Sequence, residues 1–147
     1  MSSTATGPIE IGSYVDKLAH RLGSSWPSLV AARNRAKQKH NILAGLLKGE
    51  TSPDVSIVVH GSLARLEFTS ESDLDWTFLV DGQANPQHQK DLLRLRKKLE
   101  DSNEFDQPGP EKTFGMLTFS HQIIHMIGGE NDSNANTTRR ILLLLEA

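Results

Sequence analysis

Hydrophobic positions along the chain follow two different spacings. In some stretches apolar residues recur every three or four positions, as they do on the buried side of an amphipathic helix. This spacing predicts helices over residues 11–22, 28–48 and 87–101, with shorter ones over residues 62–68 and 136–145. Residues 120–127 are expected to form either a helix or an extended segment. Short runs rich in β-branched and aromatic residues predict buried strands over residues 55–60, 73–80 and 113–119. The mixture of helices and strands predicts an α/β or α+β fold.

The same pattern suggests how the chain is divided. Residues 1–9 are small and polar and are expected to be disordered. Residues 10–147 are expected to form one domain, with N-terminal helices over 10–50, a central core over 51–135 and the start of a C-terminal helix over 136–147.

The expected last helix contains the apolar run Ile141–Leu145 and ends without a capping residue. Two explanations are open: the chain is a fragment of a longer protein, or the helix is short and docks on the core. An exposed apolar stripe on this helix also predicts self-association.

The segment with the most candidate functional residues connects two of the predicted strands. A Gly-Ser pair at 61–62 follows the first strand, and Asp73 and Asp75 open the second. Residues i and i+2 of a strand project to the same face, so the two aspartates lie side by side, with Leu74 and Trp76 on the other face. Two adjacent carboxylates favour a cation between them, and Mg²⁺ takes such oxygen ligands together with substrate phosphates. The glycine allows close backbone approach to a phosphate, and a helix starting there would add free N–H groups.

Composition is that of a soluble globular protein. The chain has 147 residues, 37% hydrophobic and 23% charged, which suffices for one domain with a core. The formal net charge of -2 argues against a nonspecific nucleic-acid surface. The sequence has no cysteine, which excludes disulfides and thiolate metal sites and fits a reducing compartment such as the cytoplasm. Neither a secretion signal nor an apolar run of membrane-spanning length is present, so no membrane partner is expected.

Residues 61–75 read Gly-Ser-x-Ala-Arg-x-Glu-x-Thr-Ser-x-Ser-Asp-Leu-Asp. This text resembles the signature of nucleotidyltransferases of the DNA polymerase beta superfamily, and it looks closest to bacterial uridylyltransferase domains and to the minimal nucleotidyltransferases of toxin–antitoxin pairs. The resemblance covers residues 55–80 well and the rest loosely. It implies a small mixed sheet with helices packed mainly on one face. It also implies transfer of a nucleoside monophosphate from an NTP to a hydroxyl of a protein or small molecule, dependent on Mg²⁺ or Mn²⁺ and releasing pyrophosphate.

The resemblance also implies roles for individual residues. The metal-binding and catalytic residues would be Asp73 and Asp75, and the nucleotide-binding residues would be Gly61, Ser62, Arg65 and Ser72. Ser62 is equally suited to cap a helix, a role compatible with phosphate binding. Arg65 has an alternative role as a surface salt bridge to Glu67 or Glu71. Ser72 is suited to support the loop before Asp73 through a side-chain-to-backbone bond.

One part of the family pattern is missing. Active members usually carry a third acid on a neighbouring strand, whereas residues 113–119 contain none. Asp106, shortly before that strand, is the best substitute in the sequence. Two alternatives therefore stay open beside the enzyme: a regulatory module that binds nucleotide without turnover, and a minimal nucleotidyltransferase antitoxin that acts on a toxin partner.

Several other polar residues are expected to be structural or stay ambiguous. His60 closes the first strand and is expected to be packed rather than to bind a ligand. His121 and His125 share a helix face but lack the intervening acid of a zinc protease motif. Arg139 and Arg140 suit either solvated surface charge or contacts with phosphates.

Overall fold

The computed structural model describes residues 11–50, 52–109 and 113–146, and the chain divides into two units, Met1–Ala31 and Ala32–Ala147. The first unit contains α1 (Ile11–Leu22) and the first residues of α2 (Pro27–Leu47). Gly23 follows α1 with a φ of +57°, and its N–H donates to the His20 carbonyl, which closes the helix. Residues 1–9, which were expected to be disordered, lie outside the described residues.

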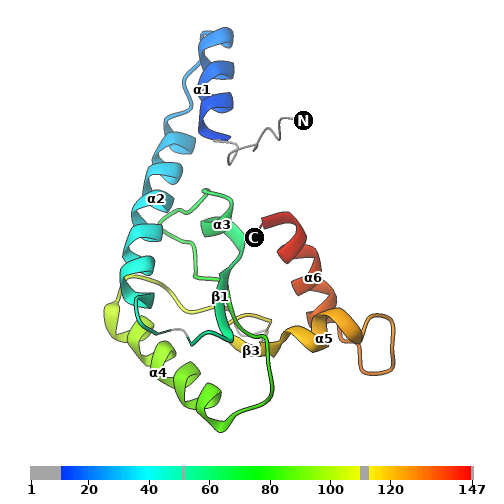
Figure 1. Ribbon diagram of the computed structural model, residues 1–147. Helices are drawn as coiled ribbons and strands as arrows, with labels where there is room; N and C mark the ends of the chain where they lie inside the picture. The colour runs from blue at the N-terminus through cyan, green and yellow to red at the C-terminus, as the bar shows by residue number, and fades with distance from the viewer. Residues whose placement is uncertain (1–10, 51, 110–112, 147) are drawn as a thin grey trace, which may run out of the picture. The chain divides into compact units, whose positions relative to one another are not determined.

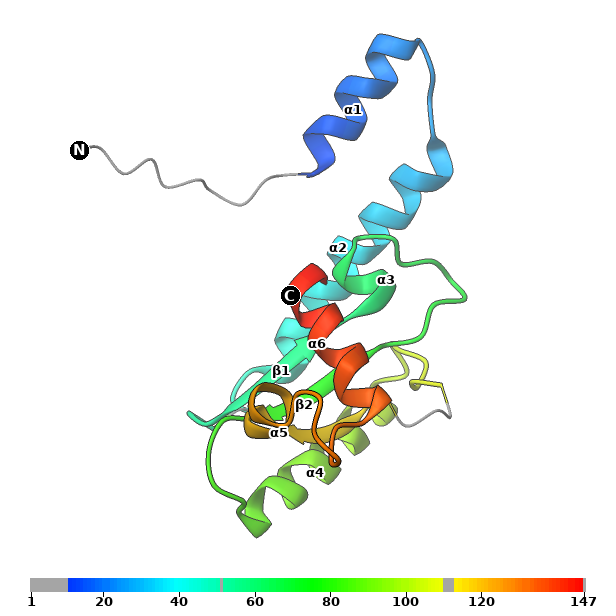
Figure 2. The same cartoon turned by 90° about the vertical axis from the view of Figure 1, so that its right-hand side faces the viewer.

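The second unit is built around a three-stranded sheet in the order β1-β2-β3 (Figures 1 and 2). β1 (Val55–Val59) runs antiparallel to β2 (Trp76–Val80), and β3 (Met116–Phe119) runs parallel to β2. A parallel pair needs a crossover connection, and α4 (Pro86–Ser102) lies within it. The predicted mixed α/β architecture is confirmed.

The hydrophobic core lies on one face of this sheet. Trp76, Phe78 and Val80 alternate along β2 and are at most 1% exposed. They belong to one cluster with apolar side chains from α4 and α2, namely Leu92, Leu95, Leu99, Ala36 and Leu43. The two longest described helices thus contribute buried side chains to the same core as β2.

The ends of α4 show why this helix forms where it does. Pro86 occupies its first turn, and the Asn85 side chain accepts a hydrogen bond from the Gln87 N–H at 2.9 Å. Asn103 ends the helix in the left-handed conformation, with φ of 52°. His88 is buried and pairs with Asp54 at 2.9 Å, which ties the helix to the turn before β1.

α6 (Asn134–Glu146) lies on the other side of the sheet from α2 and α4 (Figures 1 and 2). It contacts α5 (Ser120–His125) and the single-turn helix α3 (Gly61–Ala64). Ser133 begins α6, because its Oγ accepts a hydrogen bond from the Asn136 N–H at 3.1 Å.

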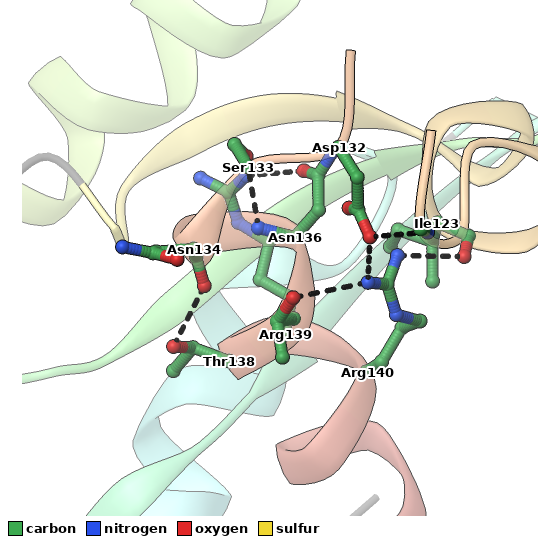
Figure 3. A network of polar contacts seen from close by, with 10 residues as sticks. Ile123, Asp132, Ser133, Asn134, Asn136, Thr138, Arg139 and Arg140 are labelled. Atoms are coloured by element: carbon green, nitrogen blue, oxygen red, sulfur yellow. Dashed lines mark hydrogen bonds and ion pairs between the residues drawn. The ribbon is translucent and has the colours of Figure 1, made fainter. Parts of the chain in front are cut away.

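Two arginines fasten the first half of α6 (Figure 3). Arg139 is buried and donates from Nε and Nη2 to the Thr113 carbonyl at 3.0 and 2.7 Å. Arg140 donates to Asp132 at 2.6 Å and to the Ile123 carbonyl at 3.2 Å. The interpretation as solvated surface charge was wrong for this pair, since both guanidiniums are largely buried and hydrogen-bonded to protein oxygens. Contact with phosphates stays a prediction.

Most differences from the predicted elements concern their ends. β2 begins at Trp76 rather than Asp73, and β3 begins at Met116 rather than Thr113. The helix expected over residues 62–68 is the four-residue α3, and the last helix starts at Asn134 rather than at 136. No described helix is both long and apolar enough to cross a membrane.

The core assignment can be tested on α4 with a matched pair of leucines. Leu95 is 1% exposed, whereas Leu93 on the outer side is 54% exposed. We expect Leu95→Ala to lower the free energy of unfolding by about 2–5 kcal/mol through loss of burial and a cavity. Leu93→Ala should change it by less than about 1 kcal/mol. Urea denaturation measures both, and equal losses would contradict this packing.

Candidate functional site

The end of β1 places Gly61, the glycine of the motif, next to Asp75. The His60 N–H donates to the Asp75 carbonyl at 2.9 Å, which extends the β1–β2 ladder by one residue. Gly61 then turns with a φ of +68°, a conformation that favours glycine. A Cβ at Gly61 would stand 2.5 Å from Oδ2 of Asp75. The backbone and the carboxylate therefore touch at a position where only glycine fits.

Asp73 and Asp75 alternate with core residues as the sequence predicted. Leu74 and Trp76 are 2% and 1% exposed, whereas both aspartates are partly accessible. The Asp73 carboxylate is close enough to Asp75 to raise the pKa of Asp75 by charge repulsion. Burial first, then the charges of Asp73 and Glu146, raise the pKa of Asp75 to about 6 from an ordinary value of 3.8. The site thus concentrates negative charge that a cation would relieve.

Asp106 is brought beside this pair through its backbone. A parallel β-bridge joins Asp73 to Asp106, and the Leu74 N–H donates to the Asp106 carbonyl at 3.0 Å. The described part of the chain nevertheless contains no group of three or more His, Cys, Asp or Glu side chains placed to hold a metal ion. Asp106 as the third acid therefore stays a prediction.

An anion is bound next to the aspartates, and it comes from the chain itself. Oε2 of Glu146, in the last turn of α6, accepts the Gly61 N–H at 2.7 Å. Oε1 accepts from Nη1 of Arg65 at 2.5 Å, and the Glu146 side chain is 6% exposed. Burial alone would raise the pKa of Glu146, but the hydrogen bonds from Gly61 and Arg65 outweigh it and lower that pKa. Gly61 and Arg65 therefore form an anion-binding pair.

Sequence reasoning missed Glu146. Its two partners were both identified as nucleotide-binding candidates, but the acid lies 85 residues from Gly61 along the chain. Its only sequence signal is an acid at the end of a strongly apolar helix segment, which is where a lone polar side chain most needs a partner.

The other predicted nucleotide-binding residues lie around this pair. Arg65 also bonds Glu67 at 2.9 Å, so the predicted salt bridge is present, while Glu71 is not a partner. Ser62 lies in α3 and is half-buried, and the cap position of this helix is taken by His60 rather than Ser62. Ser72 accepts the Thr69 N–H at 3.0 Å, which is the predicted side-chain-to-backbone bond before Asp73.

The histidines also have defined positions. His60 is 1% exposed, packs against the Phe114 ring at 5.5 Å, and its burial lowers its pKa. The expected packing role of His60 is confirmed. The His121 and His125 rings lie 4.9 Å apart on the exposed side of α5, as their spacing predicted.

The donor set fits a divalent oxygen-loving ion of the Mg²⁺ type. Such an ion is commonly held by one or two carboxylates and completes its shell with substrate phosphates and water. Asp73 and Asp75 supply two carboxylates, and the raised pKa of Asp75 shows how unfavourable their charges are without a counter-ion. The anion-binding pair places a second anion, the Glu146 carboxylate, beside them.

The charge at Asp75 predicts a pH dependence of stability. Between pH 3.8 and about 6 the folded protein keeps a proton that the unfolded chain has lost, so this residue makes stability fall as pH rises through that window. We expect Asp75→Asn to stabilise the protein above pH 6, on the order of 1 kcal/mol after solvent screening, with little effect near pH 4. Urea denaturation across this range measures the difference, and a difference independent of pH would contradict the environment described for Asp75.

Comparison with known proteins adds one finding. The family model of the nucleotidyltransferase domain matches residues 42–107, a segment that contains the whole Gly61–Asp75 motif and Asp106. Neither the curated proteins nor the solved structures gave a significant match. The family expected from the motif is confirmed, while β3, α5 and α6 lie beyond the matched segment. Residues 42–107 thus match the nucleotidyltransferase domain, which is consistent with a polymerase-beta-like nucleotidyltransferase.

Proposed function

We propose that this chain binds a nucleoside triphosphate at the Gly61–Asp75 site and transfers its nucleoside monophosphate to a hydroxyl. The domain match supports nucleotidyl transfer as the general activity. The observation that carries the proposal is the anion-binding pair of Gly61 and Arg65, already holding a carboxylate, directly beside Asp75. Phosphate oxygens have the charge and the hydrogen-bonding capacity that this pair accepts.

The contacts of the site residues suggest a role for each of them in nucleotide binding. The Gly61 N–H and the Arg65 guanidinium would bind oxygens of the triphosphate. Asp73 and Asp75 would hold Mg²⁺ or Mn²⁺ through their carboxylates. When bound, such an ion supplies neutralisation of the charge on the triphosphate and on the departing pyrophosphate. Ser62 would add a hydroxyl near the phosphates, and Ser72 would hold the loop that precedes Asp73.

The reaction needs little covalent chemistry from the protein. An oxygen of the acceptor hydroxyl bonds to the α-phosphorus, the bond from that phosphorus to the oxygen of the β-phosphate breaks, and pyrophosphate leaves. The hydroxyl proton is lost to solvent. The chain would contribute positioning and electrostatic stabilisation through donors at the two ends of α3, Gly61 and Arg65, and through carboxylates next to β2. The acceptor belongs to a protein or a small molecule, and a toxin partner is one alternative within that class. A cytoplasmic, bacterial setting is part of the proposal.

A nucleotide-binding module without turnover is the second candidate. β3 carries no acid, and within the described ranges no three metal-binding side chains cluster. Both observations favour binding over catalysis, whereas the approach of Asp106 to Asp73 favours the enzyme. The two candidates predict the same nucleotide binding and differ in turnover.

Binding is tested by removing the acid pair. We expect Asp73→Asn combined with Asp75→Asn to weaken Mg²⁺-dependent NTP binding at least tenfold, because the carboxylates that hold the ion are lost. Isothermal titration calorimetry with each of the four NTPs measures this. Asp101→Asn, at the exposed end of α4, is the control and should leave affinity unchanged. Unchanged affinity in the folded double variant would refute the proposed site.

Turnover is tested with labelled NTPs, Mg²⁺ or Mn²⁺, and cell lysate as the source of acceptor. Transfer of label that depends on Asp73 and Asp75 would establish the enzyme. Binding without transfer would establish the second candidate.

Self-association through the last helix stays a prediction. Ile141, Leu144 and Leu145 are 51%, 86% and 76% exposed on α6. Covering such side chains would be favourable, so we expect the protein to associate as its concentration rises. Sedimentation velocity should show this and should show weaker association for Leu144→Ser. Leu93→Ser, at an exposed leucine of α4, is the control, and equal behaviour of both variants would contradict the predicted surface.

A further inference from the structure

We propose that α6 inhibits the chain's own nucleotide site, because the Glu146 carboxylate occupies the position that a phosphate oxygen of the substrate would take. This inference rests on the proposed function, since it identifies the group that the substrate must displace. It assigns α6 a regulatory role that the matched domain segment does not include.

Glu146 occupies hydrogen-bond donors that a phosphate of the substrate would use. The Glu146 carboxylate accepts hydrogen bonds from the Gly61 N–H at 2.7 Å and from the Arg65 guanidinium at 2.5 Å. These two donors are the ones proposed above to bind phosphate. A backbone N–H presents a single donor hydrogen. Arg65 also donates from Nε to Glu67, so two edges of its guanidinium are already in use. A phosphate and Glu146 therefore compete for the single Gly61 hydrogen, and both would use the edge of the Arg65 guanidinium that faces Glu146.

The two halves of α6 are held in different ways. Its first half is fixed by Arg139 and Arg140, through bonds to Thr113, Asp132 and Ile123 (Figure 3). In its last turn Leu144 and Leu145 are 86% and 76% exposed, whereas Leu143 is partly buried. The bonds of Glu146 are the side-chain hydrogen bonds found for that turn among the described residues. Loss of two hydrogen bonds would free the last turn while the first half stays docked.

Competition has a measurable consequence. A ligand that binds only the open state has its affinity reduced by the fraction of molecules in that state. Removing the competing carboxylate should raise the apparent affinity by the inverse of that fraction. We expect a gain of about tenfold or more, which corresponds to an open fraction of about one tenth or less.

The experiment is calorimetric titration with inorganic tripolyphosphate and Mg²⁺, which probes the phosphate position without a base or sugar. Wild-type protein is compared with Glu146→Ala and with the isosteric Glu146→Gln, which guards against a folding defect in the first. Glu130→Ala, at an exposed loop position, removes the same charge as a control and should bind as the wild type does. Hydrogen exchange is measured in parallel on the last turn of α6.

Tighter binding of both Glu146 variants, and faster exchange of the last turn when tripolyphosphate binds the wild type, would support the inference. Equal affinities would overturn it and leave the proposed function standing. Weaker binding by the variants would also overturn it and would make Glu146 a part of the binding site. No binding by any of the proteins, to tripolyphosphate or to NTPs, would overturn the inference and the proposed function together.

Discussion

The second unit depends on β2 and the residues just before it, which have the hydrophobic core on one face and Asp75 on the other. Along residues 74–80, alternate side chains enter the core, and the residues between them face the side that carries Asp75. A shift of one residue would bury the acids and expose Trp76 and Phe78. Burial of those two aromatic rings therefore fixes where the carboxylates point. Packing and chemistry are set by the same register, so the site needs no separate device to orient it.

On the opposite side of the sheet, several negatively charged carboxylates lie close together. Burial and then the charges of Asp73 and Glu146 raise the pKa of Asp75, and the Arg65 guanidinium offsets only part of this. Glu146 is tolerated because Gly61 and Arg65 hydrogen-bond its carboxylate, whereas the described residues give the Asp75 carboxylate no comparable partner. The negative charge that remains on the aspartates is what a divalent ion would neutralise.

Much of this arrangement could be predicted from neighbouring residues in the sequence. The strand alternation, the approach of Gly61 to Asp75 and the loop bond of Ser72 all depend on short stretches with strong local preferences. The bond between Glu146 and Gly61 could not be predicted, since it depends on where α6 docks. Arg139 was misjudged for the same reason, because its partner is a backbone carbonyl on another segment. Helix and strand ends also shifted, as single hydrogen bonds from residues such as Ser133 decide them.

The distance in sequence between Gly61 and Glu146 also bears on how the protein folds. Contacts between residues 85 positions apart form late, because a long segment of chain must first be ordered. The β1–β2 pair and α3 can assemble from residues 55–80, well before the last turn of α6 arrives. Each molecule would then pass through a stage in which the anion-binding pair is formed and uncovered. Fraying of that last turn in the native protein would revisit the same stage, so the final step of folding and the opening of the site would be one motion.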